Sequence, residues 1–131
     1  HNPYSIKTLL RALPTYLRYE RILIVFGASQ THLPRQLLWE ARDAGQRLLV
    51  TQAHHPKAVP SQELAEVGRE LGYQVTAHDT VSHAMQQALD EAAPRDLVLI
   101  TGSLFVVAEA REAWGVLHGL PSLPSDPPGV Y

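Results

Sequence analysis

Hydrophobic and polar positions follow two alternating patterns along the chain, which predict alternating strands and helices. Short unbroken apolar runs are typical of strands that are buried on both faces of a parallel sheet. Two such runs occur, within residues 21–26 and 97–101, and the segments 47–51 and 73–77 are predicted as two further strands. Elsewhere apolar residues recur every three or four positions, which is typical of helices that cover a sheet. This spacing predicts helices at residues 2–13, 33–43, 61–71, 80–92 and 104–114.

The order of these segments predicts an α/β fold. Strands separated by helices of ten to thirteen residues require right-handed crossovers. We therefore expect a three-layer, Rossmann-like domain over residues 1–114, with a mostly parallel sheet and helices on both of its faces. Residues 115–131 hold four of the ten prolines and three glycines, so they are predicted to form an irregular C-terminal tail.

Several predicted helices contain residues that bear on their boundaries or packing. Asn2 is a good N-cap, and Pro3 suits the first helical position. Pro14 is expected to end or kink the first helix. Trp39 and Trp114 fall on predicted helices and are interpreted as packing residues.

Composition narrows the classes of function. The chain has 131 residues, 45% hydrophobic and 18% charged, which predicts one folded domain rather than a disordered segment. Eleven Lys and Arg against thirteen Asp and Glu leave no basic field to hold nucleic acid. The absence of Cys excludes disulfides, thiolate metal sites and a cysteine nucleophile. No apolar run approaches the roughly 20 residues of a membrane span, and no signal peptide is seen, so a cytoplasmic location is expected.

Candidate chemistry lies where the predicted strands end. Ligands of open parallel sheets bind beyond the carboxyl ends of the strands. The polar residues expected to converge on this edge are His1, Ser29, His54, Lys57 and Ser103.

The segment 100–104 is the most specific of these elements. A buried strand runs through Gly102 directly into a helix, with Ser103 at the helix start. Free amides and a hydroxyl at such a position bind a carboxylate or a phosphate, although Ser103 could equally serve only as the helix cap. Lys57 is interpreted either as an anion contact or as a solvated surface residue. The His54-His55 pair predicts no metal site, because adjacent loop residues point apart. The chain has no Walker A motif, G-x-x-x-x-G-K-[ST].

Four motifs, taken in order, resemble one family. They are His1-Asn2-Pro3, residues 25–28, residues 51–58 followed by Glu63-Leu64, and residues 99–105. Together they resemble the C-terminal domain of folylpolyglutamate synthase/dihydrofolate synthase, of the Mur ligase superfamily. The resemblance covers residues 1 to about 114, and the T-G-S-L-F element with the helix after it is its most specific part.

The resemblance implies part of an ATP-dependent amide ligase. In that family a central P-loop domain phosphorylates a folate or dihydropteroate carboxylate, and the amine of glutamate then attacks the acyl phosphate. The C-terminal domain is expected to help place glutamate and nucleotide. ATP and magnesium would be bound mainly by the central domain of the same protein. The isolated domain is therefore predicted to be inactive, with no nucleic-acid or membrane partner.

The resemblance also implies site residues. His1 and Ser103 would act as catalytic residues that face a shared anion, either glutamate or the reacting phosphate. Substrate-binding roles fall on Asn2, Ser29, Lys57 and Gly102. No metal ligand is implied.

Three departures from the family pattern affect these expectations. The usual D-G-A-H-N-P motif is cut before His1, so its Asp and the strand that carries it are missing, and the sheet should be one strand short. Residues 30–33 replace the common D-K-D. Lys57 stands where Arg is usual, which keeps the charge but loses the planar fork.

Two other interpretations remain. One is the C-terminal domain of another Mur-type ligase. The other is a non-catalytic α/β ligand-binding or interaction module, because an open sheet edge can recruit another chain.

Overall fold

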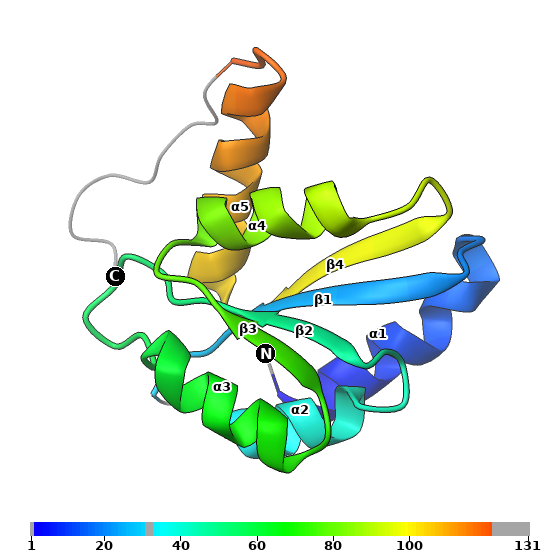
Figure 1. Cartoon of the computed structure of the whole chain (residues 1–131), viewed down its shortest axis with the longest axis vertical. Coiled ribbons are helices and arrows are strands. Elements are labelled where there is room, and N and C mark those ends of the chain that lie inside the picture. The colour runs from blue at the N-terminus through cyan, green and yellow to red at the C-terminus, as the bar shows by residue number, and fades with distance from the viewer. Residues whose placement is uncertain (1, 31–32, 122–131) are drawn as a thin grey trace.

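Helices and strands alternate along the whole domain (Figure 1). The computed structural model describes residues 2–30 and 33–121. Its elements are α1 Pro3–Tyr16, β1 Arg21–Gly27, α2 Pro34–Ala41, β2 Arg47–Val50, α3 Ser61–Glu70, β3 Gln74–Ala77, α4 Val81–Glu91, β4 Asp96–Gly102 and α5 Leu104–Leu117. Each element predicted from the apolar pattern is present, with ends that differ by a few residues.

The described strands form one sheet in the order β3-β2-β1-β4, and every pairing is parallel. At the centre of β1, Val25 lies opposite Leu49 of β2 and Ile100 of β4. The predicted α/β class is confirmed.

The two faces of the sheet are covered by different helices, as Figure 1 shows: α1, α2 and α3 lie on one face, and α4 and α5 on the other. Successive residues of β1 point to opposite faces. Ile24 and Phe26 pack toward the first group of helices, and Leu23 and Val25 pack toward α4. Both faces of β1 are thus buried, which explains why its sequence is an unbroken apolar run.

Pro14 was expected to end or kink the first helix, and it does not end it. Pro14 lies inside α1, which continues to Tyr16. A proline removes the hydrogen bond to the carbonyl four residues earlier, here that of Leu10. The next turn is still closed, since the Leu17 N–H donates to the Leu13 carbonyl over 2.9 Å. One lost bond near the C-terminus therefore does not break the helix.

The last helix also extends further than predicted, to Leu117, so residues 115–117 are helical rather than irregular. The stop signal is Gly119, at φ +63°. The Leu120 N–H donates to the Gly115 carbonyl over 2.8 Å, and the Gly119 N–H to the Val116 carbonyl over 3.3 Å. This pair of bonds is the Schellman motif that glycine favours after a helix. Residues 122–131 of the predicted tail lie outside the described residues.

The interpretation of both tryptophans as packing residues is wrong. Trp39 is 53% exposed and Trp114 43% exposed. Each ring instead contacts the C-cap residue of its own helix. The Arg42 guanidinium lies over the Trp39 ring, and the His118 ring stacks on Trp114. Helical spacing alone does not show whether an aromatic residue at the margin of the apolar face is covered.

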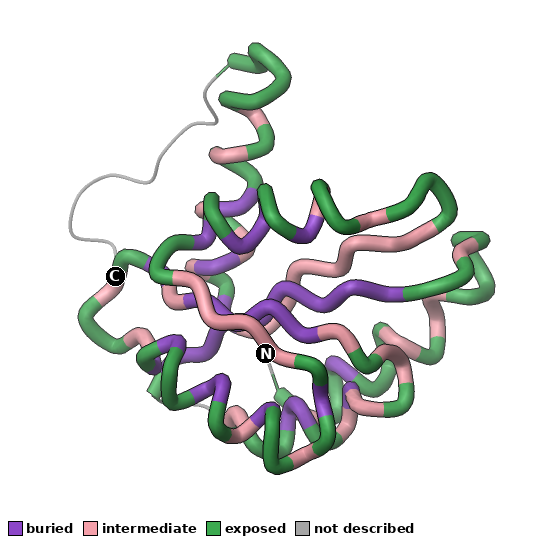
Figure 2. Tube along the Cα trace, viewed as in Figure 1, coloured by how far each residue is buried: buried purple, intermediate pink, exposed green. Residues whose placement is uncertain are grey.

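The two edges of the sheet are less buried than its centre. Figure 2 shows β1 buried along most of its length, whereas β4 is intermediate throughout. Among the described residues, no helix is both long enough and apolar enough to cross a membrane.

Candidate functional site

The carboxyl ends of β1 and β4 meet at a pair of glycines. The Ser103 N–H donates to the Gly27 carbonyl over 2.8 Å, directly after the two strands end at Gly27 and Gly102. On the other side of β1, the Thr51 N–H donates to the Phe26 carbonyl over 2.9 Å. Three strand ends are thereby held side by side.

Both glycines are required by this close approach. A Cβ on Gly102 would lie 2.0 Å from the Gly27 carbonyl oxygen, and φ at Gly102 is +108°. A Cβ on Gly27 would lie 2.5 Å from Cγ2 of Val106 and 3.0 Å from the Thr51 carbonyl oxygen. The absence of side chains lets α5 begin directly against the end of the sheet.

Ser103 caps α5. Its hydroxyl accepts a hydrogen bond from the Phe105 N–H over 3.1 Å, and the residue is only 5% exposed. The cap role that the sequence left open is therefore present. The remaining amides of the first helical turn have no partner within the helix, which makes this position attractive to an anion.

The loop of residues 53–59, here called the 53–59 loop, is paired with the residues that follow β1. The Gln30 N–H donates to the Lys57 carbonyl over 2.8 Å, and the Val59 N–H to the Ala28 carbonyl over 2.9 Å. Ser29 forms an antiparallel bridge with Ala58 between these bonds. Two of the predicted binding residues, Ser29 and Lys57, are thus brought together.

The opposite side of the 53–59 loop rests on α5. The Glu109 carboxylate accepts a hydrogen bond from the His54 N–H. The rings of His55 and Phe105 stack with their centroids 4.0 Å apart. Nδ1 of His55 accepts the Lys57 N–H over 3.1 Å. Lys57, an exposed residue, is therefore linked through His55 to the first turn of α5.

Sequence reasoning missed two residues of this edge, Glu109 and Gln52. Gln52 accepts a hydrogen bond from the Ser61 N–H over 2.9 Å, which caps α3 in place of Pro60. Both side chains bind backbone N–H groups of another segment. Because every residue except proline carries such a donor, no sequence pattern marks the partner.

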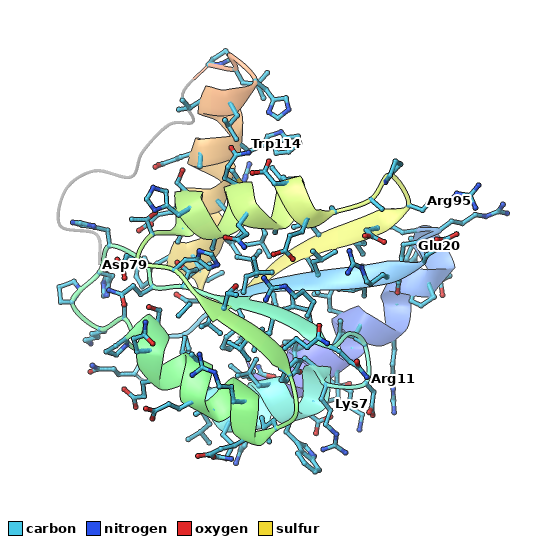
Figure 3. The ribbon with its side chains drawn as sticks, in the orientation of Figure 1. Lys7, Arg11, Glu20, Asp79, Arg95 and Trp114 are labelled. Atoms are coloured by element: carbon cyan, nitrogen blue, oxygen red, sulfur yellow. The ribbon has the colours of Figure 1, made fainter. Side chains whose placement is uncertain are left out.

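The edge next to β3 carries a histidine whose pKa is lowered. Burial, and then the nearby Arg47, lower the pKa of His78. Its backbone N–H donates to the Val50 carbonyl over 2.9 Å. Figure 3 shows the neighbouring Asp79 at this carboxyl end of the sheet, whereas the Glu20–Arg95 pair lies at the opposite end.

The predicted site residues are only partly brought together. Ser29, Lys57, Gly102 and Ser103 occupy adjoining segments of one edge, joined by the contacts above. The side-chain oxygen of Asn2 instead caps α1, where it accepts the Ser5 N–H over 2.8 Å. His1 lies outside the described residues.

The residues of this edge include three kinds of group that bind anions: the start of α5, the Ser103 hydroxyl and the exposed Lys57. Such groups bind a carboxylate or a phosphate in proteins. Within residues 2–30 and 33–121, no three or more His, Asp and Glu side chains gather as a cluster able to hold a metal ion.

Comparison with known proteins gives consistent results. The family model described as "Mur ligase, glutamate ligase domain" matches residues 1–104. A protein of Halobacterium salinarum named a probable bifunctional folylpolyglutamate synthase/dihydropteroate synthase is 31% identical over 115 residues, which cover 87% of this chain and 14% of that protein.

Two solved structures share the fold. E. coli FolC in complex with DHPP and ADP superposes with a TM-score of 0.80 at 23% identity, over 90% of this chain and 28% of FolC. The Mycobacterium tuberculosis folylpolyglutamate synthase complexed with ADP and AMPPCP gives 0.76 at 24% identity, over 94% of this chain and 29% of that one. The chain thus spans less than a third of the length of these relatives. On the family match and the shared fold, this chain belongs to the Mur ligase family, as a glutamate ligase domain.

Proposed function

We propose that the chain is the C-terminal domain of a folylpolyglutamate synthase/dihydrofolate synthase that acts in the cytoplasm. The observation that carries the proposal is the junction of Gly27, Gly102 and Ser103, where α5 begins beside the loop that presents Lys57. The names of the similar proteins support the folate branch over other Mur-type ligases.

The reaction requires charge positioning rather than a protein nucleophile. ATP supplies the phosphoryl group that activates the folate or dihydropteroate carboxylate as an acyl phosphate, and the glutamate amine then forms the amide with loss of phosphate. ATP and magnesium belong mainly to the central P-loop domain of the same protein.

This domain would contribute the anion site. The start of α5 and the Lys57 ammonium hold a carboxylate of the incoming glutamate, or a phosphate oxygen, at the carboxyl edge of the sheet. With the glutamate fixed in this way, its amine can be aimed at the acyl phosphate. The binding roles of Asn2, Ser29 and Gly102 and the catalytic role of His1 stay predictions from the resemblance.

The test concerns Ser103 in the full-length ligase. Ser103→Ala and Ser103→Gly should each raise the KM for glutamate about tenfold, because a charge-assisted contact is lost, with the KM for folate unchanged. Glycine is included because it is a nearly adequate N-cap, so it separates the loss of the hydroxyl from the loss of the cap.

Ser82→Ala, at an exposed position of α4, is the control and should leave both constants unchanged. Equal KM values for glutamate in wild-type and Ser103→Gly enzymes would refute the proposed role of this edge.

A further inference from the structure

The 53–59 loop is held from two sides, by the segment after β1 and by α5. Backbone bonds from Gln30 and Val59 fasten it to the segment after β1. On the α5 side it is held by the stacking of His55 on Phe105 and by the bond from the His54 N–H to the Glu109 carboxylate.

Glu109 lies on the second turn of α5, on the same side of the helix as Phe105, which is four residues earlier. It is half-buried, and its carboxylate accepts the backbone N–H of His54. A hydrogen bond to a charged acceptor is about twice as strong as a neutral one. The carboxylate therefore fixes the position at which the loop meets the helix.

From this arrangement we propose that Glu109 is a positioning residue for substrate binding. It holds the 53–59 loop against α5 so that Lys57 is presented beside the start of that helix. The inference rests on the proposed function of this edge, and it assigns Glu109 no contact with the substrate.

The connection between Glu109 and Lys57 is short. Glu109 fixes the backbone at His54, and the next residue, His55, stacks on Phe105. Nδ1 of His55 in turn accepts the Lys57 N–H. If Glu109 is removed, one of the two contacts with α5 is lost, and the Lys57 ammonium samples a wider range of positions.

The first measurement follows the loop itself, by NMR hydrogen exchange in the 131-residue chain. In Glu109→Ala the His54 amide should exchange at least about tenfold faster than in the wild type, because its acceptor is gone. Glu109→Gln keeps an oxygen acceptor and should retain most of the protection. Glu112→Ala, an exposed position of the same helix, is the matched control and should change nothing.

The second measurement uses the same variants in the full-length ligase. Glu109→Ala should raise the KM for glutamate about tenfold while kcat changes less than about twofold, as expected when a binding group is misplaced. Glu109→Gln should restore most of the affinity. Where Glu109→Ala does not fold, Glu109→Asp replaces it, because the shorter side chain withdraws the carboxylate from His54.

Each outcome has a defined meaning. An unchanged exchange rate of the His54 amide in Glu109→Ala overturns the inference, and so does an unchanged KM when Lys57→Ala raises it. If Lys57→Ala itself leaves the KM for glutamate unchanged, the role given to Lys57 under the proposed function fails, and the inference fails with it.

Discussion

The glycines at the strand ends show how one missing side chain can shape a site. Gly102 is subject to two constraints at once, a positive φ and a carbonyl oxygen in the space of its Cβ. Gly72 is subject to only the first, since φ is +92° there and nothing lies within 4 Å of a Cβ. Comparing substitutions at Gly72 and Gly102 therefore distinguishes the cost of the backbone conformation from the cost of the steric clash.

Gly102→Ala should destabilise the fold more than Gly72→Ala does. At Gly72 we expect a loss of about 1–2 kcal/mol in the free energy of unfolding, from the backbone conformation alone. At Gly102 the added methyl group must also displace the Gly27 carbonyl, so the loss should exceed about 3 kcal/mol. Urea denaturation measures both values, and equal losses would show that the strand ends move apart without cost.

At the scale of elements, a half-buried arginine joins two strands and a helix on the side of the sheet opposite α1. Arg47 of β2 makes two hydrogen bonds to the Glu91 carboxylate of α4, at 2.8 and 2.7 Å. It also donates to the Gln74 carbonyl and the Thr76 hydroxyl of β3. The Arg47 side chain is only 12% exposed, so the Arg47–Glu91 pair is better shielded from water than exposed pairs such as Arg35–Glu70.

The hydrogen bonds from Arg47 lower the pKa of Glu91 from its ordinary value of 4.5 to about 2. A carboxyl whose pKa is lowered on folding stabilises the protein above its unfolded pKa, and this contribution is lost as the pH falls through the folded pKa. Glu91→Gln should therefore lower the free energy of unfolding by about 1 kcal/mol at pH 7. The difference in this free energy between variant and wild type should disappear as the pH falls from about 4.5 to about 2.

Glu70→Gln is the matched control for this prediction. Glu70 pairs with Arg35 between α3 and α2, but both side chains are more than half exposed. Loss of the Glu70 charge should lower the free energy of unfolding by less than about 0.5 kcal/mol at pH 7. Thermal unfolding followed from pH 7 to pH 2 measures both variants. A Glu91→Gln difference that persists at pH 2 would mean that the ion pair is not its source.

At the scale of the whole molecule, β4 has the composition of a central strand and the position of an edge strand. Residues 97–100 are all apolar, yet every residue of β4 is only half-buried (Figure 2). An apolar groove of about 640 Å³ between β4, α4 and α5 is lined in part by Val98, Ile100 and Trp114. Figure 3 shows Trp114 on the part of α5 that extends beyond α4.

Hydrogen exchange of the 131-residue chain should reveal this open edge. Alternate residues of a strand direct their N–H groups to opposite sides, so about half of the β4 amides should exchange at least about tenfold faster than those of β1. NMR at low and high protein concentration measures both strands. Uniform protection of β4 would indicate that another chain covers its edge.

The order and type of the helices and strands follow from the sequence alone. The unbroken apolar runs and the three-to-four spacing between them were enough for the α/β class, because burial on one or both faces of a sheet constrains every residue of an element. The T-G-S-L-F segment likewise located the start of α5, since a strand, a glycine and a capping serine in succession have few other conformations.

Tertiary structure decided what depends on distant backbone groups. The end of α1 lay beyond Pro14 because one missing hydrogen bond is a small loss beside the burial of Ile6 and its neighbours. The roles of Gln52 and Glu109 could not be predicted from the sequence, because their partners are backbone N–H groups, which every residue other than proline supplies. The sequence thus determined which helices and strands form and in what order, because the apolar pattern is a local property of the chain. Only the folded chain decided which loops meet at the edge of the sheet, because those contacts depend on the relative placement of whole elements.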